Sequence, residues 1–460
     1  MSAPSRLLLA GATLVSVDPE IGERASADVL VEDGRIAAIG EGLSVEGAEV
    51  LDLRGRILAP GFVDAHLHTW QTGLRGIAVD WTLPAYFRAM HAGLATLFTP
   101  DDLYVATLVG ARVEIASGTT TLVDWCHANR TPAHTDAAVA ALRASGIRAA
   151  FFHGTPKPDP RPGEPHYSEI PHPRAEVERL LAGELGDRDG LVTLGLAVLG
   201  PHYATLEVAR ADLLLAREHG LVASMHQGGG PARTPGGWDR LLDEGLVDAR
   251  VNIVHGNDLD DSLLARLVAA GATFSIAPEG EATQGHGFPI TNRLRALGAE
   301  PSIGVDLPSI SSADMPSAAR AALCLARAQH NDAARARTGA IPDVPAASVR
   351  DALRWATIEG ARMLGLDRRI GSVTVGKQAD LVVVRPGLGQ RPVHDPVACL
   401  VMHTTPAQIE HVLVAGRFVK RDGHLVARSL DAELAALEAS GRRIAQGLEG
   451  RFATNTGGAT

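Results

Sequence analysis

Apolar and polar residues alternate over short distances near both ends of the chain. Residues 7–58 and the region from about 370 to 430 consist of short runs rich in Val, Ile and Leu, separated by Gly and Asp-Gly. This pattern is typical of β-strands joined by tight turns. We therefore expect residues 1–58 and 370–430 to pair into one small β-sandwich, with the rest of the chain inserted between them.

The middle of the chain, residues 59–369, alternates β-branched apolar runs with segments of helical periodicity, which is typical of βα units around a parallel sheet. We predict an α/β fold, a (β/α)8 TIM barrel. Its strands are expected at ILAPGFVDAH, GTTTLVDW, IRAAFFHG, LVTLGLAVLG, LVASMH, VNIVHG, TFSIAP and PSIGVD. Helices are expected at residues 101–117, 205–219, 258–270, 314–330, 346–364 and 430–448, and residues 431–460 form a C-terminal helix and tail.

Charge and cysteine content exclude some classes of function. The formal net charge is −10 and no cluster of Lys and Arg is present, which argues against nucleic-acid or membrane-surface partners. No apolar run approaches the roughly 20 residues that span a bilayer. The 3 cysteines lie far apart without a CxxC motif. We expect a cytoplasmic protein that acts on a small molecule, and a barrel of this size is expected to form a homo-oligomer.

Metal-ligand side chains stand at the ends of several predicted strands. His66 and His68 end the first strand, His226 the fifth, His255 the sixth and Asp306 the eighth. The C-terminal strand ends of such a barrel converge on the active site. Imidazole and carboxylate suit Zn²⁺, or alternatively Fe²⁺, better than Mg²⁺ or Ca²⁺. We expect one divalent ion that activates a water, with Asp306 accepting its proton and His255 beside it as a hydrogen-bonding partner or further ligand.

Six motifs along the chain resemble one known family. They are PGFVDAHLHTWQTGLRG, IASGTTTLVD, GPHYATLE, IVHGNDLDDSLLARLVAAGATFSIAP, IGVDLPSISSADM and GSVTVGKQADLVVV. Together and in this order they resemble the amidohydrolase superfamily, in particular its cytosine deaminase-like, chlorohydrolase and S-adenosylhomocysteine deaminase branch. The resemblance covers nearly the whole chain and implies a metal-dependent hydrolase that acts on carbon–nitrogen bonds other than peptide bonds.

The resemblance also implies roles for individual residues. It makes His255 the water-orienting histidine and the following residues the metal ligands: His66, His68, His226 and Asp306. His202 corresponds to a pocket histidine that contacts substrate, with a plain turn histidine as the alternative. Gln71 and Arg75 correspond to the rim of the pocket, although Arg75 can equally be a surface or helix-capping residue. The aromatic candidates for stacking a substrate, each of which can instead be core, are Trp70, Trp81, Phe87 and Trp125.

The chain departs from the family pattern in two places. Relatives of this branch carry His-x-x-Glu after the fifth strand, whereas this chain has Gly229 at the position of the acid. After the seventh strand, Glu279, Glu281 and His286 stand in a Pro-Glu-Gly-Glu and Gly-His-Gly context. Our hypothesis is that Glu281, or failing that Glu279, supplies the missing acid and that His286 helps to bind substrate. The alternative is that both glutamates are solvated loop charges.

These features predict an aminohydrolase that deaminates an N-heterocycle or a cyclic amidine. A chlorohydrolase or a ring-opening amidase or lactonase is the alternative, because loss of a general acid disfavours a poor leaving group. A non-catalytic scaffold is a remote alternative, since all the expected metal ligands are present. The Pro-rich loop at residues 156–173 is long for a compact domain and is expected to border the binding site or to be mobile.

Overall fold

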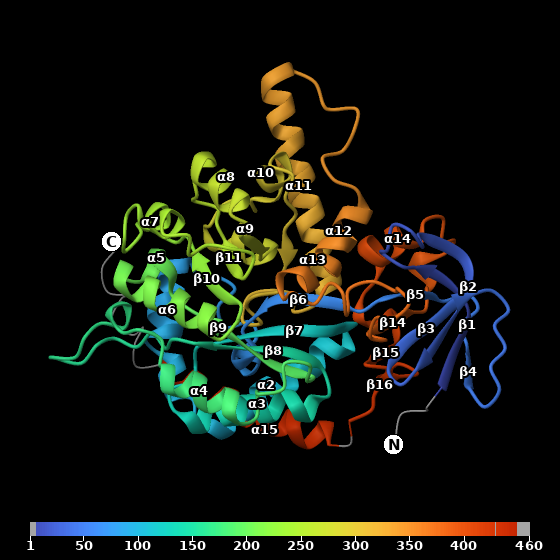
Figure 1. Cartoon of the computed structure of the whole chain (residues 1–460), viewed down its shortest axis with the longest axis horizontal. Helices are drawn as coiled ribbons and strands as arrows, with labels where there is room; N and C mark the ends of the chain where they lie inside the picture. Colours follow the sequence, from blue (N-terminus) through green and yellow to red (C-terminus); the bar gives the residue numbers. More distant parts are fainter. Residues whose placement is uncertain (1–5, 428, 449–460) are drawn as a thin grey trace, which may run out of the picture.

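The computed structural model describes residues 6–427 and 429–448. Its centre is an 8-stranded parallel sheet in the order β13-β12-β11-β10-β9-β8-β7-β6, with helices packed around it (Figure 1). The strands are β6 (Phe62–Leu67), β7 (Thr119–Cys126), β8 (Arg148–Gly154), β9 (Val192–Ala197), β10 (Ala223–Gln227), β11 (Val251–His255), β12 (Thr273–Ile276) and β13 (Ser302–Ile303).

Backbone hydrogen bonds join the two outer strands of this sheet and close it. The amide of Asp306 donates to the carbonyl oxygen of His66 at 2.8 Å, and the amide of His68 donates to the carbonyl oxygen of Asp306 at 2.8 Å. Gly304 is required here because a Cβ would lie 2.5 Å from the His66 carbonyl oxygen. The predicted (β/α)8 barrel is thus confirmed, and its closure places the first and eighth strand ends side by side.

The expected helices are present with their ends shifted by at most three residues, except that the helix expected at residues 314–330 extends to Thr338. The expected helix at residues 346–364 is two helices, broken near Thr357, whose ψ is −90°. The principal helices are α2 (Pro100–Ala116), α3 (Pro132–Ser145), α4 (Arg174–Ala182), α6 (Leu206–Glu218), α7 (Gly237–Asp243), α8 (Asp261–Ala269), α11 (Met315–Thr338), α12 (Val349–Trp355), α13 (Ile358–Met363) and α15 (Leu430–Ala445). Residues 449–460 of the expected tail lie outside the described part of the chain.

The two terminal segments share a second sheet of 9 strands, to the right of the barrel in Figure 1. Strand β1 pairs antiparallel with β2 and parallel with β4 and β5, and the two segments meet where β5 pairs antiparallel with β14. The strands are β1 (Arg6–Val15), β2 (Glu23–Glu32), β3 (Arg35–Gly40), β4 (Glu49–Asp52), β5 (Ile57–Pro60), β14 (Leu381–Val384), β15 (Ile409–Val414), β16 (Arg417–Arg421) and β17 (His424–Leu425). The exact domain limits stay a prediction.

One expected strand proved to be two. The run at residues 57–66 is divided at Gly61 into β5, which belongs to the terminal sheet, and β6, which belongs to the barrel. A Cβ at Gly61 would lie 2.1 Å from Thr120 Cγ2, so only glycine allows this close approach to β7. The apolar pattern continues through the division because both strands are buried.

The terminal sheet packs against the N-terminal end of the barrel through a buried ion pair. Arg148 at the start of β8 donates from Nε to Asp380 Oδ2 at 2.6 Å and from Nη2 to Asp380 Oδ1 at 3.2 Å. Asp380 Oδ1 also accepts from the amide of Ala415 at 2.7 Å. In residues 6–427 and 429–448, no helix has the length and apolar character needed to cross a bilayer.

Candidate active site

Side chains at the C-terminal strand ends converge as the sequence predicts. His66 and His68 come from the end of β6, His226 from β10 and His255 from the last position of β11. Asp306 follows β13, and both Asp306 and His255 adopt left-handed backbone conformations, with φ of 68° and 70°. Such conformations are costly for residues other than glycine and concentrate at functional sites.

Four of these side chains form a compact cluster of metal-ligand type. The Nε2 atoms of His66 and His68 each lie 3.2 Å from Asp306 Oδ1. His226 Nε2 lies 3.1 Å from His66 Nε2. One ligand atom from each of the four residues lies within 4.8 Å of the others. The structure therefore brings the sequence-predicted ligands together.

The chemistry of this cluster fits a bound cation. His68 Nδ1 donates to the carbonyl oxygen of Trp125 at 2.6 Å, which leaves the lone pair of Nε2 facing the cluster. Burial lowers the pKa of His66 to about 4 and holds the pKa of His226 well below its usual value, so both are neutral at pH 7. Burial alone would raise the pKa of Asp306, but its contacts with His66 and His68 hold that pKa well below its usual value. Neutral imidazoles and an ionised carboxylate are the forms that bind metal.

His255 lies beside this cluster and is held from behind by a buried glutamate. His255 Nε2 is 4.0 Å from Asp306 Oδ2, and His255 Nδ1 is 3.0 Å from Glu281 Oε1. Burial is the largest single influence on the pKa of His255 and lowers it, but the hydrogen bond with Glu281 and the charges of Glu281, Asp306 and Asp258 together raise this pKa above its usual value. Glu281 also accepts from the amide of Ala277 at 2.7 Å and from Asn257 Nδ2 at 3.1 Å.

The two glutamates that follow the seventh strand lie in different environments. Both belong to helix α9 (Pro278–Gln284). Glu281 is 0% exposed and its carboxylate points at His255 rather than into the pocket, which it does not line. Glu279 accepts from the amide of Ser312 at 2.8 Å and also lies outside the pocket lining. The acid role that we predict for either glutamate stays a prediction, and the geometry favours Glu281 acting through His255.

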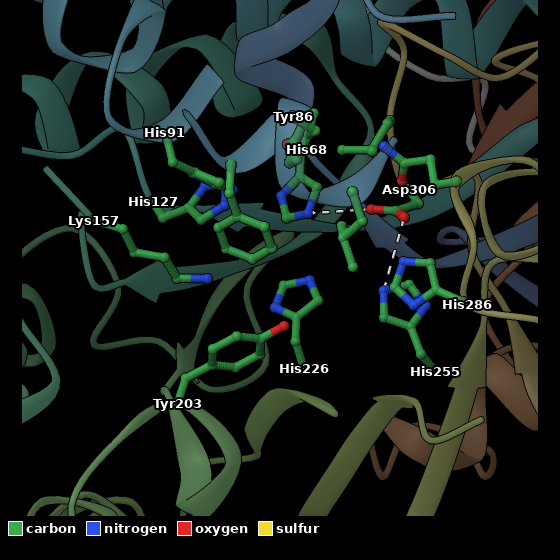
Figure 2. Close-up of a pocket in the computed structure, with 14 residues that line it drawn as sticks. His68, Tyr86, His91, His127, Lys157, Tyr203, His226, His255, His286 and Asp306 are labelled. Carbon is green, nitrogen blue, oxygen red and sulfur yellow. Dashed lines mark ion pairs between the residues drawn. The ribbon is translucent and has the colours of Figure 1, made fainter. Parts of the chain in front are cut away.

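A cavity opens beside the cluster and holds the remaining candidates for substrate contact. Figure 2 shows His255, His286 and Asp306 on one side and Lys157, His91 and His127 on the other, with Tyr203 and His226 between them. The ring of His286 lies beside that of His255, with centroids 4.5 Å apart and the planes tilted by 37°, and burial lowers the pKa of His286 to about 4. The expected position of His286 in the pocket is thus observed.

The structure places the other expected substrate residues behind or outside the pocket lining. His202 on α5 (Gly200–Tyr203) contacts Gln227 Nε2 at 3.0 Å, and its neighbour Tyr203 lines the cavity instead. Gln71 is buried between Tyr86 and Ser309. Trp70 is buried and donates to His127 Nδ1 at 3.1 Å. Arg75 has an exposed side chain away from the cavity.

Among the four aromatic candidates for stacking, Phe87 lines the cavity. Trp70 and Trp125 are buried behind pocket-lining histidines, and Trp81 packs against the main apolar core. Phe87 and His91 lie on a single π-helical turn, η2 (Phe87–His91), a form that is frequent at functional sites. Pocket contact by Trp70, Trp81 and Trp125 is therefore not seen in this structure.

The glycine that replaces the expected acid has a backbone conformation that disfavours an acid at this place. Gly229 has φ of 95°, which side chains of L-residues rarely adopt. A Cβ there would also lie 2.5 Å from Leu83 Cδ2 and 3.1 Å from the Tyr203 hydroxyl oxygen, so these side chains would have to shift. The Tyr203 hydroxyl donates to the carbonyl oxygen of neighbouring Gly228.

Several pocket residues, among them three basic ones, were not identified from the sequence. His127 directly follows β7, so the strand-end signal that found the other histidines was also available for it. His91 lies on the π-helical turn η2, which has no distinctive sequence pattern. Lys157 is the first charged residue of the Pro-rich loop after β8, and its position in the pocket agrees with the expectation that this loop borders the binding site.

The barrel and this cluster define a metal-dependent hydrolase. The amidohydrolase family model matches residues 57–419, and the chain belongs to this family. The scaffold alternative is disfavoured because all four expected ligand residues lie together in one cluster.

Relatives and solved structures agree with this class. The chain is 28% identical over 444 residues to 5-methylthioadenosine/S-adenosylhomocysteine deaminase of Symbiobacterium thermophilum, which covers 91% of this chain and 94% of the relative. It is 27% identical over 410 residues to 5'-deoxyadenosine deaminase of Methanothermobacter thermautotrophicus, covering 86% and 90%. An adenosine deaminase from Xanthomonas campestris with bound zinc superposes with a TM-score of 0.82 at 25% identity, covering 97% and 100%. Atrazine chlorohydrolase from Arthrobacter aurescens shares the fold, with a TM-score of 0.79 at 21% identity, covering 95% and 100%.

Proposed function

We propose that this chain is an aminohydrolase that removes an amino group from an N-heterocycle or a cyclic amidine, with one divalent metal ion. The observation that carries the proposal is the cluster of metal-ligand side chains at the strand ends, next to a cavity. The deaminase names of the relatives described above support the choice of an amino leaving group.

The residues that would hold the ion are His66, His68, His226 and Asp306. We favour Zn²⁺, with Fe²⁺ as the alternative, because three imidazoles and one carboxylate match the ligand preferences of these ions. The zinc in the Xanthomonas campestris structure agrees with this choice. When bound, such an ion lowers the pKa of a water molecule enough to supply a nucleophile at neutral pH.

The proton steps are assigned to Asp306 and His255. Asp306 Oδ1 faces His66 and His68, while Oδ2 lies 4.0 Å from His255 Nε2, so a proton accepted by Asp306 is close to the His255 imidazole. His255 in turn has a raised pKa and can donate a proton to the departing nitrogen. Glu281 keeps His255 oriented and protonated, which replaces a direct acid at position 229.

A second function is favoured by one observation. Among the described residues that line the cavity, Asp306 is the only carboxylate, and the backbone conformation of Gly229 disfavours another there. A leaving group that needs little protonation, such as halide or the oxygen of an activated ring, suits such a pocket. A chlorohydrolase or a ring-opening amidase or lactonase is therefore the alternative.

The test is a panel of aminopurines, aminopyrimidines, pterins and aminotriazines incubated with metal-loaded protein, with ammonia release measured for each compound. Ammonia from at least one member supports the proposal. Halide release or ring opening without ammonia would replace it with the alternative. We further infer that the protein is cytoplasmic and forms a homo-oligomer. Size-exclusion chromatography with light scattering would test the oligomeric state.

A further inference from the structure

A lysine reaches into the pocket from the side opposite Asp306. Lys157 stands just after β8, is 6% exposed and lines the cavity. Figure 2 shows its amino group directed toward the centre of the pocket, between His127 and Tyr203. This position places a cation across the cavity from the proposed metal site.

Three aromatic rings surround the ammonium group. Lys157 Nζ lies 4.9 Å from the ring centroid of Tyr203, 5.4 Å from that of Phe87 and 5.9 Å from that of Trp125. Within residues 6–427 and 429–448, no side-chain hydrogen bond or ion pair from Lys157 is present. Aromatic faces attract a cation, but less strongly than a carboxylate at hydrogen-bond distance.

Another buried lysine shows that the fold is able to provide hydrogen-bond partners. Lys420 Nζ donates to the carbonyl oxygen of Ala116 at 2.6 Å and to that of Pro406 at 3.3 Å. Burial lowers the pKa of both lysines to about 8, so both are mainly protonated at neutral pH. The two lysines differ in their contacts: among the described residues Lys157 has aromatic rings around it but no hydrogen-bond acceptor, and a ligand can provide that acceptor.

The neighbouring groups do not neutralise this end of the pocket. Burial holds the pKa values of His91, His127 and His226 well below their usual values, so these rings are uncharged at pH 7. Asp306, the carboxylate in the described lining, lies across the cavity in contact with His66 and His68. The Lys157 end thus has flat aromatic walls and an unbalanced positive charge.

We propose that Lys157 binds an anionic oxygen of the substrate, on the edge of the heterocycle away from the group that is hydrolysed. This inference rests on the proposed function and narrows it to heterocycles that carry either an ionised oxo group or a carboxylate. Flat rings contact Phe87 and Tyr203 while the anionic oxygen replaces the missing partner of Lys157. The ionised oxo group and the carboxylate would both present a negatively charged oxygen that accepts a hydrogen bond from Lys157.

Binding of product-like heterocycles to metal-loaded protein, measured by calorimetry, tests the inference without requiring turnover. Urate, an anion at neutral pH, is compared with hypoxanthine, which is neutral, and orotate is compared with uracil. We expect the wild type to prefer the anionic member of at least one pair by about tenfold or more, as a buried charge-assisted contact provides. Preference in the urate pair identifies an ionised oxo group, and preference in the orotate pair identifies a carboxylate.

Two pocket variants and one control assign the preference to Lys157. Lys157→Met should remove the preference for the anionic compound while changing the affinity for the neutral compound less than threefold. Lys157→Arg should retain the preference. Lys420→Met removes a buried lysine elsewhere and should leave the preference unchanged. Equal preference in wild type and Lys157→Met, or no preference for either anion in the wild type, overturns the inference. The proposed function fails separately, if no compound of the ammonia-release panel described above is deaminated. The binding measurements do not depend on turnover, so the two failures can be told apart.

Discussion

The two ends of the barrel treat buried polar groups in opposite ways. At the N-terminal end, Arg148 and Asp380 form a bidentate ion pair that also receives a backbone amide. At the C-terminal end, the buried histidines of the metal-type cluster crowd around the single carboxylate of Asp306, and in residues 6–427 and 429–448 the Nδ1 atoms of His66 and His226 have no hydrogen-bond partner. At the same end, His255 and Asp306 have left-handed backbone conformations, which strand residues do not normally adopt.

We interpret the paired groups at the N-terminal end as stabilising the fold, and the clustered and strained groups at the C-terminal end as placed for binding or catalysis. Unpaired and strained residues persist at functional sites because binding or catalysis depends on them. Substitutions at the N-terminal end should therefore lower stability and leave the chemistry per folded molecule intact. Substitutions at the C-terminal end should abolish chemistry with small or even favourable effects on stability.

The largest effect is expected for Asp306→Ala. Removing the only carboxylate of the four-residue cluster should lower bound metal to a small fraction of one equivalent and reduce turnover by roughly 10³-fold or more. Metal analysis by mass spectrometry and ammonia release would measure both. His411→Asn, in the terminal sheet, is the matched control and should retain metal. Full metal content in Asp306→Ala would contradict the assigned ligand set.

Arg148→Met tests the N-terminal end. It leaves a buried Asp380 without its charged partner, and breaking such a pair costs about 3–5 kcal/mol. Denaturant unfolding should show this loss, while activity per folded molecule and bound metal should match the wild type. A double variant with Asp380→Asn should regain part of the stability. Loss of activity without loss of stability would erase the contrast between the two ends.

Glu281→Gln is expected to act through His255. A glutamine keeps the size of the side chain but removes the charge that holds His255 in place, so we expect turnover to fall about 10- to 100-fold with metal content unchanged. Glu279→Gln is the control, because Glu279 contacts Ser312 outside the pocket lining. Unchanged turnover in Glu281→Gln would remove Glu281 from the mechanism.

Lys157→Met should raise stability, which is the smallest and most distinctive effect. Burial lowers the pKa of Lys157 from 10.5 to about 8, so protonation costs folding free energy at neutral pH. The gain, on the order of 2 kcal/mol, should be full below pH 8. It should vanish between about pH 8 and 10.5, where the folded wild type releases this proton before the unfolded chain does.

Chemical unfolding of both proteins across that pH range measures this gain. The titratable groups around Lys157 do not produce the same dependence of stability on pH. His91, His127 and His226 are already neutral above pH 8, and burial raises the pKa of Tyr203. Lys420→Met is the counterpart at the other end of the barrel. It leaves two carbonyl oxygens without a donor and should lower stability, so a gain in both variants would be inconsistent with our account.

The sequence predicts the barrel and the metal-type cluster because both follow from local patterns. Strand ends of a closed parallel barrel must converge, so His66, His226 and Asp306 could be brought together without knowing any loop. The division of residues 57–66 could not be predicted, because β5 and β6 are both buried and read as one apolar run.

Residues outside the strand ends could not be placed in this way. Glu281 turns toward His255 because α9 begins directly after β12, and the helix phase rather than the sequence spacing sets this direction. Gln71 and Trp70 lie next to the ligands in sequence, yet side chains of η1 (Thr69–Leu74) point into the packing behind the pocket. Lys157 lies on a loop, and the path of a loop depends on packing that a regular apolar pattern in the sequence does not predict.

The division at Gly61 has a consequence for the order of events during synthesis. Strand β5 pairs with β14, so Ile57 lies opposite Val384, and one glycine later β6 begins the segment that ends in His66 and His68. The first ligand-bearing strand is thus anchored by a segment that leaves the ribosome more than 300 residues afterwards. Contacts of such sequence separation form late. The nascent chain therefore exposes its histidines long before it can hold them in place, so we expect the proposed metal ion to bind only after β5 has paired with β14.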